Sequence, residues 1–412
     1  MSHQDDPLYH PLFVSGHGFP STWRYLLPKE FADLKLPEER LADCSECPMV
    51  GIGEYLPDCR CCTHLPQVPN FQLGLALKDP RTREATMKII RDGYALPEGI
   101  EITPAHYMRS VIAYHKDLFG KSRDIRCPLI DPESGGCAIY AYRSAICSTY
   151  YCGHDHCDSG SRYWEQLTDL IGRVETVISQ WAMEAVGITL SDYMARRNQL
   201  PHHMDELASE EARTWPARAR SYLFGDWFGD EVRFFEACAE KVMAARASLW
   251  TIACRRPILD AAKYDEALEA LAPDSPTDAP EQDDGEEREV SLEAAWTALE
   301  EATARLWALP PDGSRLALSQ DARLEENTPS DPLSGFYERK PFKLTLSHPR
   351  GEKAPTIMFL TETEHNALRS FREPKRLEPS IYREEALAAL DDPRGFLAAS
   401  IRCGVLLPSA CS

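Results

Sequence analysis

Cysteine is concentrated in the first part of this 412-residue chain. Ten of its 14 cysteines lie between residues 44 and 157, and the other four are scattered over the rest. Thiolate sulfur binds zinc and iron–sulfur clusters, whereas an isolated buried cysteine behaves as a small apolar residue. The dense group therefore predicts a metal-binding module, with disulfide or redox chemistry as the lesser alternative. An apolar role is expected for Cys238, Cys254, Cys403 and Cys411.

The spacing of the first cysteines suits a metal site built on turns. Cys44 and Cys47 form a C-x-x-C pair that a proline follows directly, so two sulfurs can converge on one ion without a helix. Adjacent side chains of an extended backbone point in opposite directions. Cys61 and Cys62 are therefore expected to serve different metals, unless one of them is structural.

Charged and nitrogen-bearing side chains lie next to these cysteines. Arg60, Arg126 and Arg143 either offset the negative charge of a four-thiolate centre or are ordinary surface arginines. His154 and His156 belong to the run Cys-Gly-His-Asp-His-Cys at residues 152–157. They could complete a mixed zinc site, but an exposed polar loop is the favoured interpretation.

The second half of the cysteine-rich stretch carries a more specific pattern. In order, it contains Cys127-Pro-Leu, Gly136-Cys137-Ala-Ile-Tyr140, Arg143-Ser-Ala-Ile-Cys147 and Cys152. Together with the earlier group that ends in Cys-Cys, this pattern resembles the zinc- or iron-chelating cysteine-cluster family (CxxCxxCC, YkgJ-like) over about residues 40–160. The chain departs from that family in two places: 11 residues separate Cys47 from Cys59, and a serine replaces the proline after Arg143.

This resemblance implies a set of metal ligands. Carried over position by position, the ligands are Cys44, Cys47, Cys61, Cys62, Cys127, Cys137, Cys147 and Cys152. Such a set could hold two tetrahedral zinc ions or iron–sulfur clusters, each of which takes four cysteines. Flagellin lysine methylases resemble the same family and are associated with an iron–sulfur cluster, which favours [4Fe–4S] over zinc. Whether Cys59, Cys157, His154 or His156 also bind metal stays open.

Three functional interpretations follow. The first is a metal-binding protein whose Fe–S cluster or zinc is structural or transfers electrons. The second, by analogy with the methylases, is a metal-dependent enzyme that modifies a protein or peptide, with a C-terminal module that docks the partner. The third is a zinc-stabilised interaction module without catalysis. The sequence does not indicate an oligomeric state.

Composition excludes several other classes. A formal net charge of −20 opposes nucleic-acid binding, which depends on phosphate neutralisation, and opposes adhesion to anionic membranes. No window approaches the ~18 apolar residues of a membrane span, and no basic region precedes an apolar run at the N-terminus. A soluble, cytoplasmic protein is therefore expected. Phosphate-binding loops, dinucleotide-binding turns, HExxH helices and nucleophile elbows are not found.

Periodicity predicts a mainly α fold with minor β structure. Apolar residues at three- and four-residue spacing predict helices near 81–92, 104–118, 162–186, 230–254 and 292–308. Residues 342–346 and 356–360 are expected to be paired strands, Thr361 to Glu364 a capping box, and 381–390 and 394–403 short helices.

The same features predict five consecutive parts. They are an irregular segment (1–40), a cysteine-rich module organised by metal (41–160), a helical region (161–272), an acidic flexible linker (273–290) and a C-terminal helical/α+β module (291–412). The C-terminal module is expected to be winged-helix-like. The linker assignment follows from its three prolines and its lack of large apolar residues.

Overall fold

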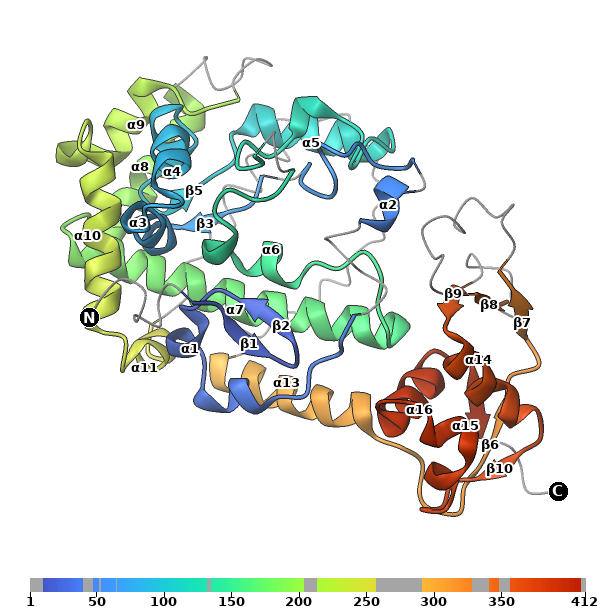
Figure 1. Ribbon diagram of the computed structural model, residues 1–412. Helices are drawn as coiled ribbons and strands as arrows, with labels where there is room; N and C mark the ends of the chain where they lie inside the picture. Colours follow the sequence, from blue (N-terminus) through green and yellow to red (C-terminus); the bar gives the residue numbers. More distant parts are fainter. Residues whose placement is uncertain are drawn as a thin grey trace. The chain divides into compact units, whose positions relative to one another are not determined.

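The computed structural model describes residues 10–39, 47–51, 53–63, 65–131, 135–203, 213–256, 291–327, 341–347 and 356–408 (Figure 1). Helices make up 53% of these residues and strands 12%, which confirms the mainly α fold with minor β structure. The predicted linker and Cys44 lie outside the described residues. The described part contains no helix with the length and apolar character needed to cross a membrane.

The chain forms two compact units, each assembled from separate stretches. The first unit comprises Met1–Leu34, Tyr55–Tyr150 and Gln166–Thr297, and the second comprises Lys35–Glu54, Tyr151–Glu165 and Ala298–Ser412. Two helices, α7 (Cys157–Ala185) and α13 (Leu292–Trp307), have residues in both units.

Helices dominate the first unit. Besides α7 and α13, the helices of this unit are α1 (Trp23–Leu26), η3 (Lys29–Asp33), α3 (Asn70–Lys78), α4 (Arg83–Arg91), α5 (Pro104–His115), η4 (Arg123–Ile125), η5 (Tyr140–Tyr142), α6 (Ala145–Thr149), α8 (Leu190–His203), α9 (Ala217–Phe224), η7 (Gly225–Trp227), α10 (Glu231–Ala244) and α11 (Leu249–Cys254). The strands are short and antiparallel: β1 (Leu12–Val14) pairs with β2 (His17–Phe19), and β5 (Gly99–Ile100) pairs with both β3 (Val68–Pro69) and β4 (Ala95–Leu96). Helices α4 and α5 confirm the predictions for 81–92 and 104–118.

Helices α3 and α10 cross at unusually close range in the first unit, where they lie side by side (Figure 1). The reason is Gly74. A Cβ atom at this position would lie 2.0 Å from the Phe235 carbonyl oxygen and 2.7 Å from the Ala239 Cβ. Only glycine allows the two backbones to approach this closely.

Helix α7 confirms the amphipathic pattern but begins earlier than predicted. Its first residue is Cys157, five positions before the predicted start at 162. Gly160 suits this extra turn, because a Cβ there would be crowded at 3.2 Å from the His154 Cβ and 3.3 Å from the His156 Cβ. Further along, Leu167, Ile171, Val174 and Ile178 are completely buried.

The single helix predicted over 230–254 is wrong, because the chain turns between α10 and α11. The Ser248 hydroxyl donates a hydrogen bond to the Ala245 carbonyl oxygen at 3.1 Å within this turn. Leu249 at the start of α11 is buried, as is Val242 in α10. The apolar pattern therefore continues across a break that periodicity does not reveal.

The C-terminal part of the second unit is built on two three-stranded antiparallel sheets. One has the order β10-β6-β11 and the other β7-β8-β9. The strands are β6 (Arg315–Leu318), β7 (Ala322–Glu326), β8 (Phe342–Leu346), β9 (Thr356–Leu360), β10 (Lys375–Arg376) and β11 (Leu406–Pro408). The predicted pairing of 342–346 with 356–360 is confirmed by β8 and β9.

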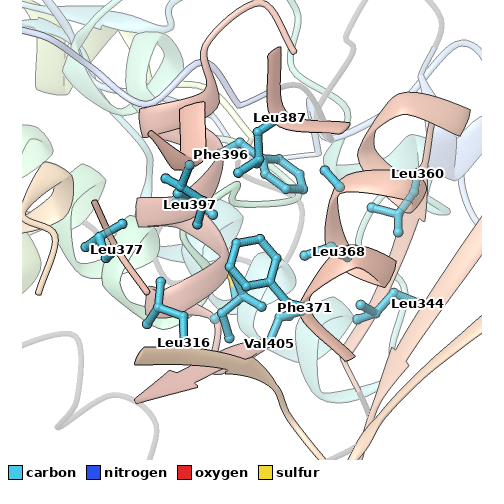
Figure 2. Close-up of a cluster of buried hydrophobic side chains, with 14 of the residues drawn as sticks. Leu316, Leu344, Leu360, Leu368, Phe371, Leu377, Leu387, Phe396, Leu397 and Val405 are labelled. Atoms are coloured by element: carbon cyan, nitrogen blue, oxygen red, sulfur yellow. The ribbon is translucent and has the colours of Figure 1, made fainter. Parts of the chain in front are cut away.

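Short helices cover these sheets and enclose an apolar core. The helices are α14 (Glu362–Arg369), η8 (Ser370–Arg372), η9 (Ile381–Arg383), α15 (Glu385–Ala388) and α16 (Pro393–Arg402). Figure 2 shows Phe371 in this core, with Leu316, Leu368 and Val405 around it. The predicted capping box at the start of α14 is confirmed by reciprocal hydrogen bonds between Thr361 and Glu364. The winged-helix likeness stays a prediction.

Two earlier stretches of chain complete the second unit. Buried Glu39 accepts hydrogen bonds from the Asp155 backbone N–H at 2.8 Å and from the indole N–H of Trp164. Lys35 lies 3.9 Å from the Trp307 ring centre and forms a 2.7 Å ion pair with Asp392 in the loop before α16. The short helix α2 (Pro48–Gly51) also belongs here.

Candidate metal centre

The predicted ligands divide between the two units. Cys61, Cys62, Cys127, Cys137 and Cys147 belong to the first unit, whereas Cys47 and Cys152 belong to the second. Cys44 lies outside the described residues.

Backbone hydrogen bonds bring the cysteine-bearing segments of the first unit together. The Cys127 N–H donates to the Cys62 carbonyl oxygen at 2.7 Å, which joins the turn at 57–61 to the segment that follows η4. An antiparallel bridge pairs Ile130 with Cys137. Cys147 lies on α6 shortly after this bridge. Three stretches of the chain therefore present cysteines in one region.

The thiols of this region act on one another. The neighbouring Cys62 thiol is the main reason why the pKa of Cys61 is raised. Burial raises the pKa of Cys147 to about 12, with smaller contributions from Cys137 and Cys61. Burial also raises the pKa of Cys127, helped by the nearby Cys147 and Cys137 thiols. These five cysteines form the thiol cluster.

The backbone that leads to Cys62 is a turn and not the extended chain that the sequence interpretation assumed for Cys61 and Cys62. The chain turns at residues 57–61, and Arg60 has a φ of 50° in the left-handed region. The Cys62 N–H donates to the Cys59 carbonyl oxygen at 3.1 Å within this turn. A turn does not impose the strict alternation of a strand, so the assignment of the two thiols to different metals stays a prediction.

Two of the three neighbouring arginines act on the thiol cluster. Arg60 opposes the rise in the pKa of Cys61, and Arg143 opposes it for both Cys137 and Cys147. Arg143 is held in place by a 3.1 Å hydrogen bond from its guanidinium to the Cys147 carbonyl oxygen. These positive charges would favour thiolates over thiols, as a metal site requires.

Cys59 is fully buried beside the thiol cluster, and burial is the main reason why its pKa is raised. The charged groups that act on it are Asp58, Arg123 and Arg126. Asp58 accepts hydrogen bonds from both arginines, at 2.7 Å from Arg123 and 3.1 Å from Arg126. Arg126 therefore forms an ion pair with Asp58 next to Cys59.

The thiol cluster has the donor chemistry of a metal site without its final geometry. Among the residues that the structure describes, no three His, Cys, Asp or Glu side chains converge closely enough to hold a metal ion. A tetrahedral zinc site requires Zn–S distances near ~2.3 Å. The thiols would have to lose their protons and move inward to meet this requirement.

The favoured interpretation of residues 152–157 as an exposed polar loop is wrong for its histidines. His156 is 1% exposed and packs edge-on against the Trp307 ring, with 4.9 Å between ring centres. His154 is partly buried, and its Nδ1 atom lies 3.5 Å from a Glu39 carboxylate oxygen. Both histidines therefore help to build the second unit, although Cys152 is exposed.

The predictions for the C-terminal cysteines have mixed outcomes. Cys238 in α10 is completely buried, in line with its apolar assignment, and burial raises its pKa. Cys254 is partly buried, and its pKa is raised to about 12 by burial and by the neighbouring Glu293. The apolar assignment of Cys403 is wrong, because this residue is bonded to Cys157. Cys411 lies outside the described residues.

A buried carboxylate near the thiol cluster was missed by the sequence interpretation. Glu175 accepts hydrogen bonds from the Gln72 side chain at 2.8 Å, the Trp23 indole at 3.2 Å and the Ala145 backbone N–H at 2.9 Å. Ala145 begins α6, the helix that carries Cys147. The signal was present in the sequence, since Glu175 interrupts the apolar face of α7.

No protein-family model, curated protein or solved structure matches this chain. The likeness to the cysteine-cluster family therefore depends on the quoted motifs alone and stays a prediction.

Proposed function

We propose that this protein binds a metal centre, either a [4Fe–4S] cluster or zinc, through the thiol cluster of its first unit. One observation carries the proposal: backbone pairing joins the segments that carry Cys62, Cys127 and Cys137, and Cys147 follows on α6. Cys44, Cys47 and Cys152 belong to the ligand set that the family resemblance implies, and they are retained as candidates.

Chance burial is a poor explanation for this grouping. A cysteine used only as a small apolar residue needs no second thiol beside it, as Cys238 illustrates, because burial alone raises its pKa. The members of the thiol cluster instead gather beside Arg60 and Arg143. Positive charges at this position would offset the negative charge that four thiolates give either centre.

Metal binding would complete the geometry of the thiol cluster. The bound metal keeps its cysteine ligands deprotonated, so binding would release the protons that the buried thiols hold. The chain would contribute the sulfur donors and the neighbouring positive charges. A reducing compartment such as the cytoplasm would keep these thiols available for the metal.

Anaerobic purification of the full chain, followed by elemental analysis and a visible spectrum, tests the proposal. Iron with acid-labile sulfide and a brown colour would identify a cluster. Stoichiometric zinc in a colourless protein would favour a structural site, and with it an interaction module that takes a protein or peptide partner. A folded preparation that contains neither metal would contradict the proposal.

A pair of variants connects the metal to the thiol cluster. Cys137→Ser is expected to lower the bound metal to less than half of the wild-type content, because it removes one of the clustered donors. Cys238→Ser, which replaces a buried thiol outside the cluster, is the matched control and should retain the wild-type metal content. Native mass spectrometry measures both. Equal metal in the two variants would show that Cys137 is not a ligand.

A further inference from the structure

The second unit contains a pair of cysteines that the metal proposal does not use. Cys157 is the first residue of α7, and Cys403 directly follows the last residue of α16. They are 246 positions apart in sequence, yet their Cα atoms are 5.3 Å apart and their sulfurs are bonded. Disulfides span Cα separations of about 4.4–6.8 Å.

We propose that Cys157 and Cys403 are a redox modification site, in which a reversible disulfide clamps the end of α16 to the start of α7. The reduced protein carries two thiols there, and the oxidised protein carries the bond. The co-reactant is a low-molecular-weight disulfide of the glutathione type.

The remaining cysteines indicate that the bond is reversible. Many other cysteines of the described part are free thiols: Cys47, Cys59, Cys61, Cys62, Cys127, Cys137, Cys147, Cys238 and Cys254. A chain stabilised by permanent disulfides in an oxidising compartment would not be expected to keep so many thiols. In reducing compartments, the disulfides that do form are usually transient and respond to redox conditions.

The two cysteines differ in exposure, which orders the reaction. Cys157 is partly buried at the edge of the apolar core, whereas Cys403 is 9% exposed within it. The Cys157 thiolate attacks the small disulfide, forms a mixed disulfide and releases one small thiol. The Cys403 thiolate then attacks the Cys157 sulfur and releases the second. Two electrons and two protons pass from the protein thiols to the reagent.

The bond would act beside a mainly apolar hollow, whose lining includes residues from the segments on both sides of the bond. They are Asp155, two residues before Cys157, and Ser400 and Val405, which flank Cys403. The Cys403 sulfur lies 3.5 Å from the Asp155 carbonyl oxygen. Figure 2 shows Val405 and Phe396, which also line the hollow, within the core of this unit. Oxidation would therefore hold the two sides together.

A glutathione redox series on the full-length wild-type protein tests the proposal. Samples are quenched in acid, alkylated and digested, and mass spectrometry gives the fraction of the peptide that links Cys157 to Cys403. One two-electron transition is expected. Both cysteines should be alkylated in the most reducing samples of the series, and they should be linked by a disulfide in the most oxidising samples. Metal content is measured in the same samples, so loss of the metal centre is scored separately.

Hydrogen exchange measures the clamp itself. In the reduced protein, α16 and the first turn of α7 should exchange on the order of tenfold to a hundredfold faster than in the oxidised protein. Cys403→Ser should exchange at the reduced rate under both conditions, and Cys238→Ser should behave as the wild type.

Three results would overturn the proposal. The first is that Cys157 and Cys403 never link to each other, or link to other cysteines. The second is that their disulfide persists throughout the redox series. The third is that the linked protein exchanges its amide hydrogens as fast as the reduced protein. The wild-type series decides the outcome by itself if Cys403→Ser does not fold.

Discussion

Glu175 shows how much one buried side chain can organise. Its carboxylate accepts hydrogen bonds from three segments that are far apart in sequence, through Trp23, Gln72 and Ala145. Desolvation by burial raises its pKa to about 7, and the three donors only partly oppose this rise. A carboxylate in this position connects α1, α3, α6 and α7 around one point.

The raised pKa of Glu175 predicts a pH dependence of stability. Below about pH 4.5, Glu175 holds its proton in both the folded and the unfolded state, and its contribution to the free energy of unfolding is fully present. Between about pH 4.5 and 7, the unfolded state releases its proton first, so the free energy of unfolding should fall by about 3 kcal/mol.

Glu175→Gln tests this prediction because glutamine has no proton to release. Chemical denaturation of the wild type and the variant at several pH values gives the two profiles. The wild-type free energy of unfolding should fall more steeply than that of the variant across this window. Parallel profiles would show that Glu175 titrates normally.

At the scale of the elements, glycine controls the close crossing of α3 and α10 in the first unit. Gly74→Ala would force its new Cβ against the Phe235 carbonyl oxygen, which is backbone and cannot swing away. We expect a loss of about 3 kcal/mol in the free energy of unfolding, as for severe overpacking.

Gly172→Ala is the matched control for this prediction. Gly172 lies inside α7, and a Cβ there would meet no atom within 4 Å. Alanine should therefore stabilise the protein by about 0.5–1 kcal/mol, because glycine is unfavourable inside a helix. In thermal denaturation, the melting temperature should fall for Gly74→Ala and rise for Gly172→Ala. A shift in the same direction for both variants would contradict the close crossing of α3 and α10.

At the scale of the whole molecule, the C-terminal core draws all its buried residues from the second unit. Phe371 is completely buried in the C-terminal core of the second unit. Phe371→Ala should leave a cavity and cost about 3–5 kcal/mol. Because the lost contacts all belong to the second unit, the damage should stay within it.

Hydrogen exchange can localise this effect. Amides of α14, α16 and β8 should lose protection in Phe371→Ala, while those of α3 and α10 in the first unit should keep it. An equal loss of protection throughout the chain would mean that the units unfold as one.

The amino-acid sequence by itself determined the local structure wherever a regular pattern was present. The segments 342–346 and 356–360 were predicted as the strands β8 and β9, three-four spacing predicted α7 and α13, and the Thr361 to Glu364 motif predicted a helix start. Helix α3 escaped prediction because it is buried on nearly every side and so lacks a polar face. Cysteine density also indicated where metal chemistry should be sought.

Only the tertiary structure decided which of these residues meet. It brought Cys157 to Cys403 across 246 positions, buried His156 against Trp307 and placed Glu175 among three distant segments. Local patterns are set by neighbouring residues along the backbone, and they can be read one element at a time. Contacts between distant segments depend on how all elements pack together, and no short stretch of sequence contains that information.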